Sequence, residues 1–377
     1  MAETLRVMML IQAYRLHNYG GAERQLASLV PLFRQRDIEV HILTRRHPGT
    51  KAYEEVQGVP VYRTFDFKNS ILTSLAFSMS GLKHIRRLRP HVLHAHGLFS
   101  PTTTATTAHQ MFGIPVVAKV LRGGVLGDVI RIKQKPMGQR RIAHLSKNVD
   151  RFITISEEIQ QELIAEGVRA EKCYYIPNGV DVERFRPLTS EQKRKQREAM
   201  GLSDGPLVVY VGRLVPEKRV DKLIHSWETV RQKFPNSQLL IIGTGSEDAT
   251  LQKLAVPNIQ FVGRVDDTST WLQVADLFVL PSISEGLSNS LLEAMACSLP
   301  IIATAVGAAP NLIRPQENGW CIPPDDLNAL TDALMASLDN LDYCQPMGKR
   351  NRDRILNDFQ LSVTADKLCR LYRELAN

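Results

Sequence analysis

Two glutamates near the C-terminal end of the chain could bind a ligand that carries hydroxyl groups. The stretch 276–296 reads DLFVLPSISEGLSNSLLEAMA, which is a short apolar run, a turn and then a helical pattern. Glu285 lies in the turn, and Glu293 lies about 7.5 Å along the axis of a helix that we expect to begin near Ser288. Two carboxylates in these places do not share a proton, so they would contact two separate hydroxyl-bearing parts of one ligand.

The first turn of the expected helix lies between the two acids. Its backbone N–H groups lack internal partners and carry the positive end of the helix dipole, so they form a site for an anion. An acid, an anion site and a second acid can together hold a sugar, a diphosphate and a ribose. Capping charges and solvated helix faces use the same residue type, so the pair alone does not establish a site.

A second loop carries two cations. VGRLVPEK at 211–218 follows an apolar run at 207–211 and contains Arg213 and Lys218. A cation about 4 Å from a phosphate charge contributes about 4 kcal/mol at an effective dielectric constant near 20. The pair could therefore take the place of a metal ion on a diphosphate. The alternative is a surface loop with ordinary charges.

Glycines and an asparagine mark two loops of the N-terminal half. Gly20 and Gly21 follow the apolar run 5–11 and precede a helical pattern. Glycines in this place let the backbone approach a phosphate or a sugar closely, although plain turns use them too. No GxGxxG turn is present, so the usual dinucleotide fingerprint is absent. Asn178, in IPNGVD at 176–181, belongs most simply to a turn that we place at the end of a strand.

The histidines and cysteines indicate no metal site. His94 and His96 point to one face of a strand, and His109 lies in the following helix, but the sequence indicates no third ligand beside the pair. We therefore predict structural histidines. The five cysteines are scattered and form no CxxC pair, which indicates a reducing compartment without disulfides or zinc.

Composition indicates a globular protein of two domains with an uneven charge. The chain has 377 residues, too many for one core, and no apolar run approaches the roughly 20 residues that span a bilayer. We expect no signal peptide at its start. Residues 1–190 have a net charge of +11 and residues 191–377 of −3. The basic half would meet something anionic; with no nucleic-acid motif, a membrane surface fits better than nucleic acid. A plain solvated face is the alternative.

Strand patterns alternate with helical patterns along the whole chain, which predicts an α/β protein with doubly wound parallel sheets. We expect strands at the ranges 5–11, 39–43, 59–63, 91–94, 115–120, 151–155, 174–177, 207–211, 239–243, 259–262, 277–280 and 301–304. A charged linker is expected at 187–204. The predicted domains are 1–187, 188–359 and a C-terminal helix at 360–377 that could pack back on the first domain.

Four segments together resemble the retaining glycosyltransferases of family 4, also called glycosyl transferases group 1, which have the GT-B fold of two Rossmann-like domains facing across a cleft. The segments are Gly20-Gly21-x-Glu23, IPNGVD at 176–181, VGRLVPEKRVD at 211–221 and SEGLSNSLLEAMA at 284–296. The resemblance implies transfer of a sugar from a UDP- or GDP-sugar to a hydroxyl of a glycan, lipid-linked or small-molecule acceptor. It also implies retention at the anomeric carbon and no metal or other cofactor.

The resemblance implies roles for individual residues. Glu285 would contact hydroxyls of the transferred sugar near the reacting carbon, and Glu293 would bind the ribose. Arg213 and Lys218 would neutralise the diphosphate, so Glu285, Arg213 and Lys218 are the predicted catalytic residues. The first domain would bind the acceptor. The remaining predicted substrate-binding residues are Gly20, Gly21, Arg122, Asn178, Val265, Gly286, Leu287, Ser288 and Asn289.

One segment departs from the family pattern. The family usually has Thr-x-His-Gly after the strand here predicted at 115–120, whereas this chain reads AKVLRGG at 118–124. Arg122 is the candidate for the polar contact that the missing histidine would make, and Asp128 could also reach the cleft. No general base is assigned. In the mechanism usually favoured for this fold, the acceptor attacks on the face that the leaving group vacates, and the departing phosphate takes the proton. A double displacement would need a protein nucleophile.

Three other classes of function remain open from the sequence. A nicotinamide dehydrogenase would share tandem Rossmann-like domains but needs the GxGxxG turn that is absent. A GT-B sugar-nucleotide epimerase would share the diphosphate site, and a non-catalytic anion-binding scaffold would share only the fold. We expect a cytoplasmic protein whose basic first domain could associate peripherally with the inner membrane face.

Overall fold

A computed structural model of the protein describes residues 4–14 and 20–377. The chain divides into two compact units, one made of Met1–Asn178 and Leu361–Asn377 and the other of Gly179–Gln360. Residues 179–187, which we expected in the first domain, therefore belong to the second unit. Hydrogen bonds explain this grouping, because Arg352 donates to the carbonyl oxygens of Phe185 at 2.6 Å and Val182 at 3.0 Å.

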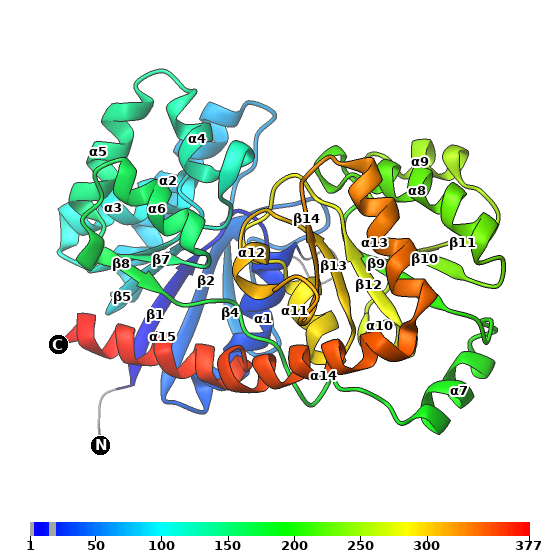
Figure 1. Ribbon diagram of the computed structural model, residues 1–377. Coiled ribbons are helices and arrows are strands. Elements are labelled where there is room, and N and C mark those ends of the chain that lie inside the picture. Colours follow the sequence, from blue (N-terminus) through cyan, green and yellow to red (C-terminus); the bar gives the residue numbers. More distant parts are fainter. Residues whose placement is uncertain (1–3, 15–19) are drawn as a thin grey trace. The chain divides into compact units, whose positions relative to one another are not determined.

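The first unit is built on one eight-stranded sheet with the order β3-β4-β2-β1-β5-β6-β7-β8. All of its strand pairs are parallel except β3 with β4, and helices cover both faces (Figure 1). The strands are β1 (Leu5–Leu10), β2 (Ile38–Arg45), β3 (Tyr53–Val56), β4 (Val59–Thr64), β5 (Val92–His96), β6 (Val116–Lys119), β7 (Arg151–Thr154) and β8 (Cys173–Tyr175). Strand β3 was not predicted, because YEEV has no apolar run.

Two of the described helices of the first unit, those that begin at Ser70 and Glu157, have side-chain N-caps, Asn69 and Ser156. Ser156, expected as an N-cap, accepts a hydrogen bond from the backbone N–H of Ile159 at 3.2 Å. The helices are α1 (Gly21–Arg34), α2 (Ser70–Leu88), α3 (Ser100–Phe112), α4 (Asp128–Lys133), α5 (Gly138–Asn148), α6 (Glu157–Ala165) and α15 (Leu361–Ala376), with short 3-10 turns η1 (Gly124–Leu126) and η2 (Ala170–Lys172).

The C-terminal helix α15 completes the core of the first unit. It contacts α1, β1 and β5, and its apolar side chains join those of α1 and the sheet in one buried cluster. Tyr372 is fully buried there, with its ring 5.9 Å from that of Phe33. Its hydroxyl lies 2.5 Å from Nδ1 of His94 on β5.

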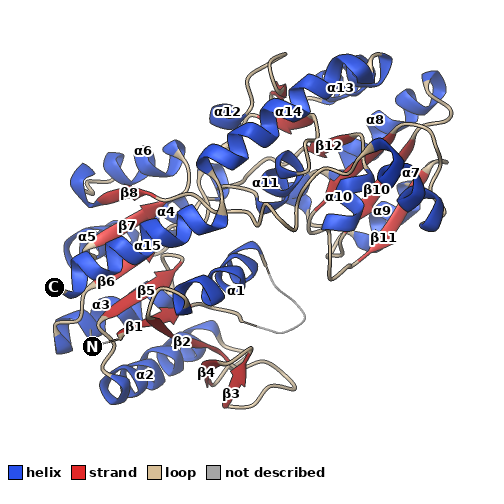
Figure 2. Ribbon diagram, turned by 90° about the horizontal axis from the view of Figure 1, so that it is seen from below, coloured by secondary structure: helices blue, strands red, loops and turns tan. Residues whose placement is uncertain are grey.

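The second unit is built on a six-stranded parallel sheet with the order β11-β10-β9-β12-β13-β14. Buried apolar runs form the central strands, as expected for a sheet covered on both faces (Figure 2). The strands are β9 (Leu207–Val211), β10 (Gln238–Ile242), β11 (Ile259–Gly263), β12 (Leu277–Leu280), β13 (Ile301–Thr304) and β14 (Gly319–Ile322). Of these, β14 was not predicted.

The expected linker contains a helix. Thr189 accepts a hydrogen bond from the Gln192 backbone, and the Gln192 side chain accepts one from the Thr189 backbone, so a capping box begins α7. The helices of this unit are α7 (Ser190–Ala199), α8 (Val220–Lys233), α9 (Asp248–Leu254), α10 (Ser269–Val274), α11 (Asn289–Ala296), α12 (Ala309–Leu312), α13 (Leu327–Asp339) and α14 (Leu341–Asp358), with a 3-10 turn η3 (Pro216–Lys218). In the described part of the chain, no helix is both long and apolar enough to cross a membrane.

Candidate active site

The strand order of the second unit places two predicted motifs side by side. Strands β9 and β12 are neighbours, and the chain continues from β9 to β10 on one side and from β12 to β13 on the other. Ligands of doubly wound sheets bind beyond the carboxyl ends of the strands at such a switch point. The loop with Arg213 and Lys218 leaves β9 there, and the loop with Glu285 leaves β12.

An ion pair joins the two loops. Lys218 Nζ lies 2.5 Å from Glu285 Oε1, and the two side chains are only 12% and 13% exposed. The backbone N–H of Ile283 also donates to the carbonyl oxygen of Glu217 at 2.9 Å. A largely desolvated charge pair held by a backbone bond is a fixed dipole, so a ligand entering here meets an ammonium and a carboxylate in set positions.

Arg213 has a fixed backbone and an exposed side chain. Its carbonyl oxygen accepts a hydrogen bond of 3.0 Å from the hydroxyl of Tyr210, which is fully buried. Burial, followed by the nearby charge of Glu285, raises the pKa of Tyr210 well above its usual value, so this hydroxyl stays protonated and donates. The Arg213 side chain is 57% exposed and lies 3.6 Å from Glu217, a weak surface pair that an anion could replace.

The loop after β12 lines a small pocket at the N-terminus of α11. Ser288 is the N-cap and accepts a hydrogen bond from the Leu291 backbone at 3.4 Å, so the helix begins where the sequence predicts. The backbone N–H of Ala308 donates to Gly286 at 2.8 Å. The pocket is lined by Leu280, Glu285, Gly286, Ser288, Leu291, Thr304, Val306, Ala308 and Ala309. Three of the predicted binding residues thus share one pocket.

Glu293 is more buried than a residue on a solvated helix face. It is 5% exposed on α11, and the hydroxyl of Thr268 donates to its Oε2 at 3.3 Å. Thr268 precedes α10, which follows β11, so Glu293 is held from a third strand end. Thr268 could not be predicted as a site residue, because nothing in its local pattern links it to a helix 25 residues later. Val265 lies half-buried in the same loop after β11.

The predicted residues of the first unit lie at the carboxyl ends of its strands. Gly20 directly precedes α1, and a Cβ there would lie 2.5 Å from Oε2 of Glu23, so a larger residue would displace that carboxylate. Asn178 accepts a 2.7 Å hydrogen bond from Lys119 Nζ on β6. Arg122 follows β6, and its carbonyl oxygen accepts from the backbone N–H of Asp128 at 3.0 Å. Asp128 is itself buried, which raises the pKa of its carboxyl.

Lys119 is a buried cation that the sequence analysis did not single out. It is 5% exposed, and burial lowers its pKa to about 8. In the strand register it is opposite His96. His94 and His96 are stacked with ring centroids 4.4 Å apart, and burial lowers the pKa of His96 to about 3. The described residues provide no hydrogen-bond partner for either ring nitrogen of His96.

This histidine pair predicts a loss of stability in acid. Because the pKa of His96 is about 3 in the folded protein and 6.5 for an unperturbed histidine, the unfolded chain binds more protons between these values, and stability falls as the pH drops through 6.5. The loss is about 1.4 kcal/mol per pH unit for one histidine at its steepest. The slope of the unfolding free energy against pH gives the number of protons that the chain takes up when it unfolds. We expect His96→Asn to lower this number by about one between about pH 4 and 6.5, measured by urea unfolding.

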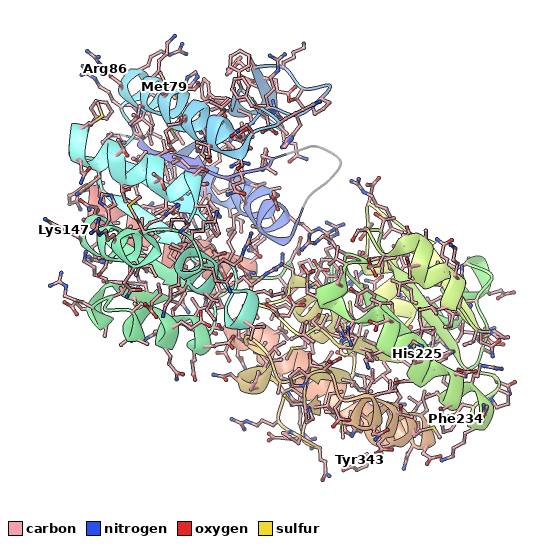
Figure 3. The ribbon with its side chains drawn as sticks, turned by 90° about the horizontal axis from the view of Figure 1, so that it is seen from above. Met79, Arg86, Lys147, His225, Phe234 and Tyr343 are labelled. Atoms are coloured by element: carbon pink, nitrogen blue, oxygen red, sulfur yellow. The ribbon has the colours of Figure 1, made fainter. Side chains whose placement is uncertain are left out.

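The matched control is His225→Asn, which replaces an exposed histidine of the second unit (Figure 3). It removes a histidine of the second unit and leaves the buried His96 in place, so the two variants can be compared directly. If the protein with His96→Asn retains the full slope, burial of His96 does not determine the acid sensitivity.

Among the described residues, no group of three or more His, Cys, Asp or Glu side chains is arranged to hold a metal ion. The described cysteines are all free.

Comparison with known proteins identifies the family. Residues 19–184 match the family model described as Glycosyltransferase Family 4, and residues 205–340 match Glycosyl transferases group 1. Together the two models span both units. The chain therefore belongs to family 4 of the glycosyltransferases, and it is a glycosyltransferase of the GT-B type.

Relatives of known activity match over most of the chain. A GDP-mannose-dependent monoacylated alpha-(1-6)-phosphatidylinositol monomannoside mannosyltransferase of Corynebacterium glutamicum is 27% identical, covering 93% of each chain. A UDP-Gal:alpha-D-GlcNAc-diphosphoundecaprenol alpha-1,3-galactosyltransferase of Escherichia coli is 26% identical, covering 81% of each.

Solved structures share the fold. Sucrose-phosphate synthase from Thermosynechococcus elongatus superposes with a TM-score of 0.83 at 22% identity, covering 98% of this chain and 99% of that one. HepE of Anabaena, in complex with UDP and glucose, superposes with a TM-score of 0.82 at 18% identity, covering 98% of this chain and all of that one.

Proposed function

We propose that the protein transfers a hexosyl group from a nucleoside diphosphate donor to a hydroxyl group, with retention at the anomeric carbon and without a metal ion. The observation that carries the proposal is the ion pair between Lys218 and Glu285 at the switch point of the second unit. Its Nζ and Oε1 atoms are 2.5 Å apart, and both side chains are largely buried. At this place the cation can bind a diphosphate while the carboxylate accepts hydrogen bonds from sugar hydroxyls.

The charges of the second unit fit the two ends of such a donor. Lys218 and the exposed Arg213 supply two positive charges beside the N-terminus of α11, where the leaving diphosphate gains negative charge. Glu293, buried and held by Thr268, is suited to accept hydrogen bonds from ribose hydroxyls. Glu285 is occupied by Lys218, so we assign it to sugar hydroxyls and not to nucleophilic attack.

The reaction that follows from this assignment needs no protein nucleophile. The acceptor hydroxyl attacks the anomeric carbon on the face that the diphosphate leaves, and the departing phosphate oxygen takes its proton. Arg122 is our candidate for the polar contact that the missing histidine would make. The names of two relatives give the donor as GDP-mannose and as UDP-Gal. The base of this protein's donor therefore stays open between guanine and uracil.

Proton NMR of the transferred sugar tests this proposal. The one-bond carbon–proton coupling constant at the anomeric carbon of the product should be that of the donor's configuration, and turnover should persist in EDTA. Inversion would contradict the retaining mechanism, and loss of activity in EDTA would contradict metal independence. An isomerised donor in the absence of acceptor would indicate an epimerase.

We further propose that the acceptor is presented at an anionic membrane surface. Helix α2 exposes four large apolar side chains, with Ile71, Leu72, Leu75 and Met79 between 51% and 73% exposed. The helix contains no acidic residue, and its C-terminal half carries Lys83, Arg86 and Arg87; Met79 and Arg86 are labelled in Figure 3. An apolar face followed by cations matches a bilayer with anionic headgroups.

Vesicle sedimentation tests this surface. We expect Leu75→Ser/Met79→Ser to weaken binding to phosphatidylglycerol-containing vesicles by about tenfold or more, because each side chain loses part of the roughly 1.5–3 kcal/mol gained on burial. The control, Leu254→Ser/Tyr343→Ser, removes two exposed apolar side chains from the second unit and should bind as before. Equal binding to neutral and anionic vesicles would contradict the role of the cations.

A further inference from the structure

Three cations of the first unit gather on one aromatic ring. The charged groups of Arg131, Lys135 and Arg141 lie 5.1, 5.2 and 5.9 Å from the ring centroid of Phe99. Arg131 lies in α4, Lys135 follows that helix, and Arg141 belongs to α5. Contact with the ring face holds each cation in place, so the three charges stay together although they repel one another.

The cluster lies at the switch point of the first sheet. Phe99 is in the loop after β5, and β5 is the neighbour of β1. The chain continues from β1 to β2 on one side and from β5 to β6 on the other. The carboxyl edge at such a point is where doubly wound sheets bind their ligands. The cations therefore lie where a ligand of this unit is expected, and not on a remote surface.

The guanidinium of Arg141 is oriented by the same loop and by the first turn of α3. Its Nη2 donates to the carbonyl oxygen of Leu98 at 3.1 Å and to the hydroxyl of Thr103 at 2.8 Å. Helix α3 begins at Ser100, directly after Phe99, so the positive end of its dipole adds to the cations. Arg45, at the end of β2, donates to the Ser100 hydroxyl at 3.2 Å.

The cluster keeps its positive charge. In the part of the chain that the structure describes, no ion pair joins Arg131, Lys135 or Arg141 to an acid. The carboxylate of Asp128 acts on Arg131 from a distance, but that carboxylate is buried and accepts from the backbone of Leu121 at 3.3 Å. Three cations and a helix N-terminus without a paired acid suit a ligand with at least two negative charges.

We propose that this cluster binds a phosphate or diphosphate group of the acceptor, separately from the diphosphate of the donor. Arginine forks match the oxygens of phosphate in pairs, and lysine adds a point charge. The acceptor class that follows is a phosphorylated sugar or a sugar linked to a lipid through phosphate. This assignment rests on the proposed transferase function, because an acceptor exists only if the protein transfers a sugar.

Calorimetric titration with inorganic pyrophosphate tests the site while a saturating nucleoside diphosphate occupies the donor site. Arg131→Gln/Lys135→Gln should raise the dissociation constant of pyrophosphate by about tenfold or more, because two charge-assisted contacts are lost. The matched control is Arg140→Gln/Lys147→Gln, which removes the same charge from α5 without touching the cations on Phe99. It should change the constant less than about twofold.

Three results would overturn the proposal. The first is an unchanged dissociation constant of pyrophosphate in Arg131→Gln/Lys135→Gln, and the second is an equal change of this constant in both double variants. The third is that Arg131→Gln/Lys135→Gln loses binding to phosphatidylglycerol vesicles but still binds pyrophosphate as before. The last would identify the cluster as a membrane-facing charge and not a phosphate site. Failure of the transferase proposal is read separately, since it appears as the absence of sugar transfer from any nucleotide-sugar donor, whereas pyrophosphate binding by the first unit can still be measured.

Discussion

Lys218→Met is expected to lower kcat for donor turnover by about 10² to 10³. At an effective dielectric constant near 20, a cation about 4 Å from a phosphate charge contributes about 4 kcal/mol, and this interaction strengthens as the leaving group gains charge. Lys218 is only 12% exposed, so water replaces it poorly. The release of nucleoside diphosphate in a coupled assay measures the effect.

Two further variants separate catalysis from structure. Lys233→Met removes a lysine that is paired with Asp339 on the surface at 2.6 Å and should change the rate less than about twofold. If Lys218 acts only by neutralising Glu285, then Glu285→Gln in the Lys218→Met background should restore the rate. Restored activity would contradict a direct contact of Lys218 with the diphosphate.

Gly243→Ala should destabilise the second unit by about 3 kcal/mol or more, because both the backbone and the space forbid a side chain there. Gly243 has a φ of +135°, and a Cβ would lie 1.8 Å from the carbonyl oxygen of Gly212. Gly212 begins the loop that carries Arg213, so relief of the clash must move that loop. The midpoint temperature of thermal unfolding and the affinity for nucleotide should both fall.

The control for this substitution is Gly201→Ala. Gly201 also has a positive φ, +65°, but no atom lies within 4 Å of its Cβ position, so only the backbone strain of about 1 kcal/mol applies. A stable protein with Gly243→Ala and normal nucleotide affinity would show that the close packing of β9 against β10 does not position the loop.

Continuous apolar runs explain why the strands that carry the site could be predicted. The predicted bounds of β9, β12 and β13 are the observed ones, since each run is buried on both faces and is followed by turn residues. The start of α11 could be predicted as well, because Ser288 is a cap directly before an apolar helical pattern.

Long-range pairing explains what could not be predicted. The Lys218–Glu285 ion pair joins residues 67 positions apart, and it depends on β9 lying beside β12, which no local pattern encodes. The contact of Thr268 with Glu293 joins residues 25 positions apart that follow different strands, and no local pattern encodes it either. Strand β14 (GWCI) is only partly buried and lacks a clear apolar run, and α7 was mistaken for a linker because its residues are almost all charged or polar.

Thermal stabilisation by a panel of UDP, GDP, ADP, CMP and NAD, each with and without EDTA, tests the central claim most directly. A ligand at about 100 times its dissociation constant adds about 2.7 kcal/mol to the stability of the folded protein. We predict a clear shift with one nucleoside diphosphate that EDTA leaves unchanged, which would also name the base of the donor. A shift with NAD alone, or with none of the five, would contradict the assignment of Arg213, Lys218, Glu285 and Glu293 to a nucleotide-sugar site.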